Sequence, residues 1–206
     1  MDAVAGPQGT GTLAAPPVAF PLVDLFRRYF RMLRIMLAAR RGRRLTLDDV
    51  GRVPSRVWLS EIDELRHMNN GVYLGLMDHA RLDLLARAGV WAQLTAAGIY
   101  PVVTQQTISY RKSLQLGQRY VIETRVLGYD ERQVYVEQQF VVRGDITARA
   151  IVAGRMLRKT GGTVTMAELG DITGVNVAER PVPAWVSAWA AASRLPSNRE
   201  TAMSDW

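Results

Sequence analysis

Apolar and polar residues follow two different periods along this chain. Between residues 70 and 88 apolar side chains recur three or four positions apart, which predicts a helix with one buried face. From Tyr100 to Leu157 the period is two, with short glycine-containing or polar turns between the runs, as expected of strands. We expect a first strand over residues 51–61 before the helix. After the helix we expect an antiparallel meander of strands over residues 100–111, 119–127, 133–142 and 146–157, with the helix across one face of the sheet.

A second amphipathic helix is predicted over residues 22–39, where apolar side chains fill one half of the helix and arginines interrupt the other. A spanning helix needs roughly 20 predominantly apolar residues, and the arginines exclude one here. Two interpretations remain open: a helix lying on an anionic membrane surface, or a helix packed on the domain or a partner. Exposure of Phe26 and Phe30 in the free protein would favour the membrane.

The pattern divides the chain into four parts. Residues 1–21, rich in Gly, Ala and Pro, are interpreted as a flexible leader, and residues 22–44 as the basic helix with its linker. Residues 45–162 form the main domain. The extension over residues 163–206 is expected to carry a short helix from Ala184 to Arg194.

Composition excludes several classes of protein. The chain has 206 residues, 48% of them hydrophobic, and no cysteine, so a disulfide framework, a thiolate metal site and a cysteine nucleophile are excluded. Only His67 and His79 are available as imidazole ligands, and neither a metal nor a bound cofactor is expected. The net charge is +7, but the arginines before residue 45 carry much of that excess. The main domain is therefore not predicted to bind nucleic acid.

Polar residues concentrate where the first strand gives way to the long helix. Asp63, His67, Asn69 and Asn70 lie there, just before amide N–H groups that have no partner within a helix. Such amides can polarise a carbonyl group. Either asparagine is a plausible N-cap. From the local sequence alone, Asp63 is equally interpretable as a cap or turn residue.

The run from Asp63 to Leu74, Asp-Glu-Leu-Arg-His-Met-Asn-Asn-Gly-Val-Tyr-Leu, resembles the Asp-x-x-Gly-His-Val-Asn-Asn-x-x-Tyr signature of acyl-CoA and acyl-ACP thioesterases of the 4-hydroxybenzoyl-CoA thioesterase group. The strand end Tyr110-Arg-Lys-Ser-Leu followed by Gly117 also looks like that family, and the order of elements is that of its hotdog fold. The resemblance covers roughly residues 52–159. Arg66 departs from it, because the family commonly has glycine there.

The resemblance implies an α+β hotdog fold, in which an antiparallel sheet wraps the long helix. It implies hydrolysis of an acyl-CoA or acyl-ACP thioester, with Asp63 as general base or nucleophile. Amides around Asn70 and Gly71 would hold the oxyanion. By analogy His67 would orient the substrate or the attacking water, although a structural hydrogen bond is an equal alternative; Asn69 is expected to hold the turn and lie close to the substrate.

Family sites of this kind lie between subunits, so a homodimer or higher homo-oligomer is expected. Gln105 and Thr107 are candidates for the wall that the second chain contributes. Arg111 and Lys112 are candidates to meet the phosphates of CoA, and each is equally interpretable as a solvated charge at a strand end. The expected location is cytoplasmic, with peripheral membrane contact through residues 22–44.

Two other functions are considered. A non-catalytic hotdog protein would bind acyl groups or act as a scaffold on a membrane or a partner, and its pocket beside Asp63 would be filled by side chains. A hotdog dehydratase or hydratase would pair a catalytic histidine with an acid deeper in the site, and the paired asparagines after His67 speak against it.

Overall fold

The structure is a computed structural model that describes residues 29–30, 32–33, 37–39, 41–196 and 200–204. The predicted leader over residues 1–21 lies outside the described residues, as does Phe26. The described fragments of the predicted N-terminal helix are helical, and Tyr29 and Phe30 are 66% and 52% exposed. Among the helices in the described part of the chain, none has the length and apolar content needed to cross a bilayer.

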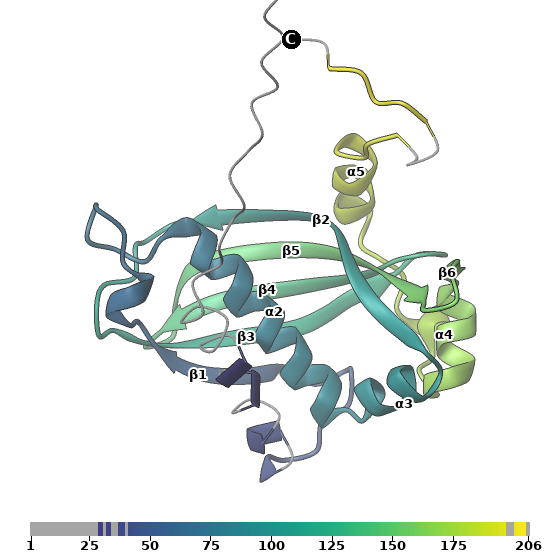
Figure 1. The fold of residues 1–206 in the computed structure, drawn as a ribbon, viewed down its shortest axis with the longest axis horizontal. Coiled ribbons are helices and arrows are strands. Elements are labelled where there is room, and N and C mark those ends of the chain that lie inside the picture. The colour runs from purple at the N-terminus through teal and green to yellow at the C-terminus, as the bar shows by residue number, and fades with distance from the viewer. Residues whose placement is uncertain (1–28, 31, 34–36, 40, 197–199, 205–206) are drawn as a thin grey trace, which may run out of the picture.

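One antiparallel sheet forms the body of the molecule, with the strand order β1-β3-β4-β5-β2 (Figure 1). A short strand, β6, pairs with the far end of β5. The strands are β1 (Gly51–Arg56), β2 (Ile99–Tyr110), β3 (Arg119–Tyr129), β4 (Val134–Val142), β5 (Asp145–Arg158) and β6 (Thr163–Val164).

The predicted meander is correct for β3, β4 and β5 and wrong for β2. That strand pairs with β5 at the edge of the sheet, and its other edge has no strand partner among the described residues. The reason is the connection over residues 111–118, which is not a hairpin turn. The Met68 N–H donates to the Leu114 carbonyl, and the Val57 N–H donates to that of Gln118. The connection thus passes beneath the start of the long helix before β3 begins.

The helical parts also depart from the prediction in places. The first predicted strand stops at Arg56, and a single 3-10 turn, η1 (Leu59–Glu61), follows it. Two helices that the pattern did not predict, α3 (Val90–Ala96) and α4 (Met166–Thr173), close one end of the sheet. The predicted C-terminal helix is present as α5 (Ala184–Ala192).

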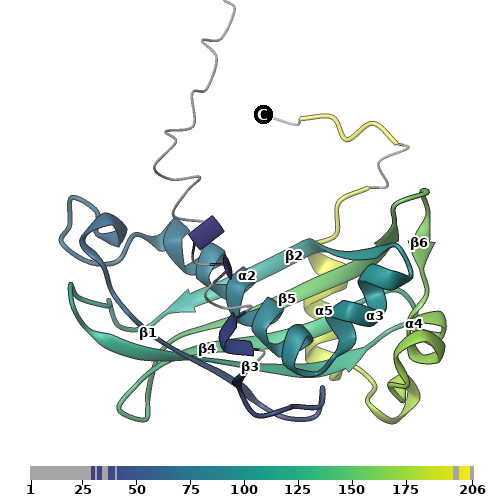
Figure 2. The same ribbon diagram turned by 60° about the horizontal axis from the view of Figure 1, so that its bottom comes forward.

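The long helix α2 (Asn70–Arg87) lies across the inner face of the sheet, as the hydrophobic pattern predicts (Figures 1 and 2). It buries Tyr73, Leu76 and Met77 against strand residues that include Tyr120 and Phe140. The centroids of the Tyr73 and Phe140 rings lie 4.7 Å apart. Burial of each such large side chain stabilises the fold by roughly 1.5–3 kcal/mol, so this contact fixes the position of the helix.

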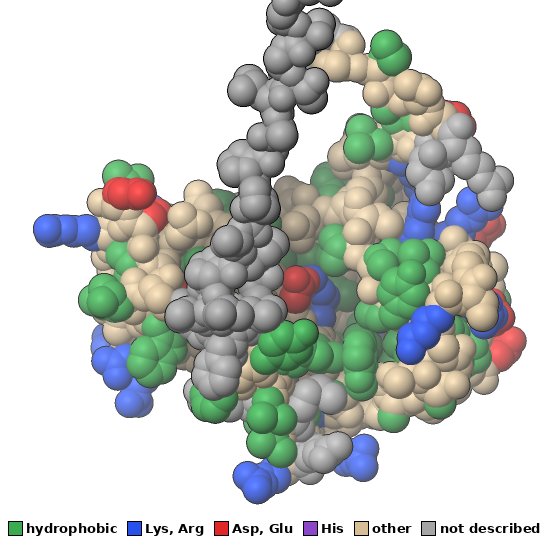
Figure 3. All heavy atoms as spheres, viewed as in Figure 1, with side chains coloured by type: hydrophobic (Ala, Val, Ile, Leu, Met, Phe, Trp, Pro, Cys, Tyr) green, Lys and Arg blue, Asp and Glu red, His purple; other side chains and the backbone are tan. Residues whose placement is uncertain are grey.

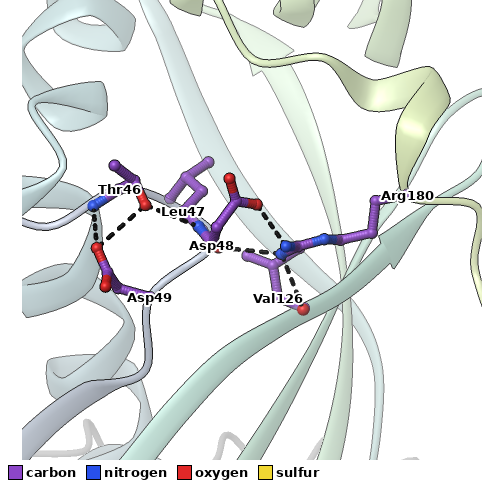
Figure 4. A network of polar contacts seen from close by, with 6 residues as sticks. All are labelled: Thr46, Leu47, Asp48, Asp49, Val126 and Arg180. Atoms are coloured by element: carbon purple, nitrogen blue, oxygen red, sulfur yellow. Dashed lines mark hydrogen bonds and ion pairs between the residues drawn. The ribbon is translucent and has the colours of Figure 1, made fainter.

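The C-terminal extension packs on the same sheet. Helix α5 lies on the outer face, behind the sheet when α2 is in front (Figure 2). Arg180 joins the extension to the segment before β1: its guanidinium donates to the carbonyl oxygens of Leu47 (3.2 Å) and Val126 (3.3 Å) and pairs with Asp48 (Figure 4). The segment before β1 and the extension are thereby fixed to strand β3.

A buried carboxylate provides a test of this sheet. The side chain of Glu137 on β4 is 1% exposed and pairs with Arg125 (2.6 Å) and Arg149 on the neighbouring strands. Burial alone would raise the pKa of this carboxyl, but the two guanidinium groups outweigh it and lower the pKa. The stabilisation is therefore present above the pKa of an unfolded glutamate and is lost as the pH falls through the folded value.

We expect Glu137→Gln to lower the free energy of unfolding at neutral pH by about 1–2 kcal/mol, because two part-exposed arginines lose their buried partner. Denaturant unfolding at several pH values measures this, and the two proteins should converge at acid pH. Glu123→Gln is the control, since its pair with Arg52 is more exposed and should contribute less than about 1 kcal/mol. Equal losses in the two variants would contradict the expectation.

Candidate functional site

Asp63 sits in a tight loop that its own backbone closes before α2. Its N–H donates to the His67 carbonyl (3.0 Å), and its carbonyl accepts from the Arg66 N–H (3.0 Å). One carboxylate oxygen, Oδ1, accepts from the Leu65 N–H (3.0 Å). The loop therefore fixes the carboxylate, and no backbone N–H of the described residues donates to its second oxygen, Oδ2.

The structure brings Asp63 and His67 together. His67 Nδ1 lies 3.5 Å from Asp63 Oδ2, and the two side chains are 26% and 13% exposed. The same ring nitrogen lies 3.4 Å from the Met68 carbonyl oxygen. The pair is shielded without being closed to solvent, so a water molecule can reach it. The chemical roles of the two residues stay predictions.

Arg66 occupies the backbone conformation that explains the glycine of the family signature. Its φ is 64°, in the left-handed region, where a side chain costs roughly 1–2 kcal/mol and glycine costs nothing. The loop keeps the shape of the signature, because Arg66 adopts this conformation and directs its exposed side chain away from the buried core.

We expect Arg66→Gly to raise the free energy of unfolding by up to about 1 kcal/mol, since the relief of left-handed strain exceeds the extra entropy of an unfolded glycine. Denaturant unfolding measures the change. Arg119→Gly is the matched control, because Arg119 is an exposed arginine in the strand β3 and its replacement should destabilise the fold. A loss of stability in Arg66→Gly would show that the arginine side chain makes a contact worth more than the strain.

One of the two predicted oxyanion donors, the Gly71 N–H, already forms a hydrogen bond at the start of α2. Asn69 is the N-cap, and its Oδ1 accepts the Gly71 N–H (2.8 Å). The Val72 N–H donates to the Asn69 carbonyl (3.0 Å). No acceptor within the described residues meets the Asn70 N–H. Of the amides that the sequence indicated, that of Asn70 is therefore the available donor at the positive end of the helix.

Tyr110 is a site residue that the sequence analysis did not single out. Its hydroxyl donates to the Asn70 carbonyl (3.0 Å), and its ring meets that of Tyr73 edge-on with 5.1 Å between centroids. Burial raises the pKa of Tyr110. The last residue of β2 is thus fixed to the first residue of α2. The strand alternation was a usable signal, since it places Tyr110 on the same face as Ile108, which packs on the core.

The structure does not bring Gln105 and Thr107 to Asp63. The Gln105 side chain donates to the Ala190 carbonyl of α5 (2.9 Å) on the outer face. Thr107 stands opposite Ile151, which also packs under α5. The register of β2 shifts between Val103 and Gln105. One extra residue exchanges the two faces of a strand, and a role for these two side chains in the wall that a second chain contributes stays a prediction.

Arg111 and Lys112 are engaged by a turn of their own chain. Both pair with Asp145 at the start of β5, Lys112 at 2.6 Å, and both side chains are more than half exposed. The Arg111 Nε also donates to the Ile146 carbonyl (2.7 Å). The two cations lie at the Tyr110 end of β2, and a role toward CoA phosphates stays a prediction.

A large apolar cavity lies along the C-terminal half of α2. It has a volume of ≈ 540 Å³, is partly open to solvent, and is lined by α2, α3, α4 and the sheet. Its lining includes neither Asp63 nor His67. Its apolar lining includes Leu82, Leu84, Leu85, Val90, Trp91, Val102, Val126, Val136 and Met156.

Two charged residues line this cavity. Arg81 pairs with Asp78 and donates to Gln138 Oε1 (2.5 Å), and burial lowers the pKa of its guanidinium. Figure 3 shows an acidic and a basic side chain in a hollow between hydrophobic surfaces. The described residues contain no group of three or more His, Asp or Glu side chains placed to hold a metal ion.

Comparison with known proteins gives consistent results. The family model described as the thioesterase-like superfamily matches residues 57–190. The protein named THEM6 of Danio rerio is 38% identical over 103 residues, which are 50% of this chain and 51% of that protein. The chain thus spans about half the length of the curated relatives it matches.

Solved structures show the same fold. YbaW, a probable thioesterase from Escherichia coli, superimposes with a TM-score of 0.56 and 23% identity, over 59% of this chain and 94% of that one. A DHNA-CoA thioesterase from Staphylococcus aureus gives 0.54 and 16%, over 71% and 97%. The α+β hotdog architecture expected from the sequence is confirmed.

Proposed function

Because this chain belongs to the thioesterase-like superfamily, we propose that it hydrolyses an acyl-CoA or acyl-ACP thioester to a carboxylic acid and a thiol. The observation that carries this proposal is the presence of three groups within one short segment, the loop before α2 and the first residue of the helix. They are the Asp63 carboxylate, the His67 ring beside it and the unoccupied Asn70 N–H. A base, an orienting group and an oxyanion donor are what acyl transfer to water requires.

In the proposed reaction Asp63 Oδ2 accepts a proton from a water molecule that attacks the thioester carbonyl carbon. The carbonyl oxygen becomes an oxyanion and accepts the Asn70 N–H at the positive end of α2. The C–S bond then breaks, and the thiolate takes up the proton held by Asp63. If Asp63 instead attacks directly, water hydrolyses the resulting anhydride. His67 holds the carboxylate in position in either case.

The geometry favours a site shared by two chains. The Tyr110 end of β2 contacts the start of α2, beside the loop that contains Asp63. Near the other end of β2, Val102 and Val103 line the apolar cavity. These ends are about 25 Å apart along the strand. Antiparallel pairing of two β2 edges would set the Tyr110 end of one chain beside the cavity of its partner. The acyl group would then occupy the cavity of the second chain.

The proposal is tested by the release of free thiol from a panel of acyl-CoA substrates of increasing chain length. The chain has no cysteine, so a thiol reagent reports CoA alone. We expect release above the uncatalysed rate for at least one substrate. A folded protein that releases no thiol from any of them, or from acyl-ACP, would contradict the proposal.

A non-catalytic membrane scaffold is the second candidate. It is favoured by the exposed aromatic side chains of Tyr29 and Phe30 in the basic N-terminal segment. It predicts binding to anionic vesicles without thiol release, so the same substrate panel separates the two functions.

A further inference from the structure

A second pocket lies on the outer face of the sheet, opposite α2. It has a volume of ≈ 480 Å³ and is formed by the middle of β2, by β5 and by the C-terminal end of α5. Arg155 reaches it from β5, and Trp189 and Arg194 reach it from the region of α5. The thioester site proposed above is on the other face, so this pocket is a separate structure.

Two positively charged side chains line this pocket. No Asp or Glu lines it, and within the described part of the chain neither Arg155 nor Arg194 pairs with a carboxylate. Asp130 stands nearby, but its Oδ2 accepts the Tyr135 hydroxyl (2.7 Å) and its Oδ1 accepts backbone N–H groups. Arg111, Arg149 and Arg158 show the contrast, since each of them pairs with an acid.

Arg155 is only partly solvated as well. Its Nε is buried and meets no acceptor among the described residues. A guanidinium that has lost water on one side, without gaining a protein partner, interacts more strongly with an anion at its remaining N–H groups than a surface arginine does. Burial and the Asp130 carboxylate raise the pKa of Tyr135, and the positive charges of Arg194 and Arg155 oppose that rise.

The polar neighbours of the arginines are already satisfied and do not neutralise them. Gln105 donates to the Ala190 carbonyl (2.9 Å), and the Gln133 amide donates to Thr104 Oγ1 (2.8 Å). Trp189 adds a flat, half-buried ring to the wall. The pocket thus contains two guanidinium groups and one aromatic ring, and its volume is much larger than that of a single inorganic anion.

We propose that this outer pocket binds the phosphate group of a nucleotide-like ester, with Arg155 and Arg194 on the phosphate and the ring of Trp189 beside the base. Guanidinium groups match phosphate oxygens in pairs, and an aromatic face accepts any base by stacking. The same chemistry is present in a free nucleotide and in the nucleotide portion of CoA, and the two sources are separated below.

The test uses the full-length protein and calorimetric titration with AMP, inorganic phosphate and CoA. We expect AMP to bind more tightly than inorganic phosphate. Arg155→Gln and Arg194→Gln should each weaken AMP binding about tenfold or more, as expected for loss of a charged hydrogen-bonded contact. Arg119→Gln, which removes an exposed arginine of β3 outside the pocket, should leave it nearly unchanged. Asp63→Asn should also leave it unchanged, which makes the result independent of the proposed function.

Competition identifies the source of the phosphate. Displacement of AMP by CoA in the Asp63→Asn protein would assign the nucleotide portion of CoA, and AMP binding without such displacement would assign a free nucleotide. Arg194 is exposed, so its variant keeps the test valid if Arg155→Gln fails to fold. Absence of AMP binding, AMP binding no tighter than inorganic phosphate, or equal affinity in Arg194→Gln and wild type would overturn the proposal.

Discussion

Asp63→Asn is expected to lower kcat for thioester hydrolysis by about 10²–10⁴-fold, the usual contribution of a positioned general base. The asparagine Oδ1 can still accept the Leu65 N–H that Asp63 accepts now. The loop should therefore keep its shape, and the loss should come from the missing proton acceptor. Steady-state rates on the best acyl-CoA substrate measure the effect.

Glu64→Gln is the matched control for this variant. Glu64 is the next residue, is exposed, and loses the same charge. Its rate should stay close to that of wild type, and both variants should unfold at the wild-type denaturant concentration. Hydrolysis by Asp63→Asn at the wild-type rate with every active substrate would remove Asp63 from the mechanism.

Val102→Phe is expected to change the preferred acyl length. Val102 is half-buried and lines the apolar cavity from β2, so a phenyl ring there takes up space proposed for the acyl chain. Each methylene that a hydrophobic pocket can no longer hold costs about 1–3 kcal/mol of transition-state binding. We expect kcat/KM for long-chain acyl-CoA to fall by at least about tenfold and that for acetyl-CoA to stay unchanged.

Ser109→Phe is the control for the cavity variant, because it adds a ring to the same strand at a position opposite the exposed Arg149 and outside the cavity lining. It should leave the chain-length profile as it is. A parallel fall for long and short substrates in Val102→Phe would indicate a general disturbance of the strand and would contradict the assignment of the cavity to the acyl chain.

Local patterns predicted the elements well where one face of each is buried. The spacing of Tyr73, Leu76 and Met77 places α2 correctly, because these side chains must all contact the sheet. The short α3 and α4 were missed. In them only a few residues, such as Leu94 and Leu169, are buried, which is too few to establish a period.

Only part of the arrangement of the candidate site can be predicted from the local sequence. The order of Asp63, His67 and Asn69 in one loop was enough to predict their proximity, since a tight loop leaves them no other place. The position of Gln105 depends on a β-bulge, and the fate of the Gly71 N–H depends on which asparagine caps the helix. Both are settled by hydrogen bonds between parts of the fold that local residue types do not specify.

We propose that Asp63 of one chain acts on a thioester whose acyl group lies in the cavity of a second chain. Co-expression of Asp63→Asn and Val102→Phe chains with different affinity tags, followed by isolation of the mixed dimer, tests it most directly with a long-chain acyl-CoA. In that dimer one site combines an intact Asp63 with an intact cavity. We expect the mixed dimer to be much more active than either variant alone, with activity approaching half that of wild type. A mixed dimer no more active than the separate variants would contradict it.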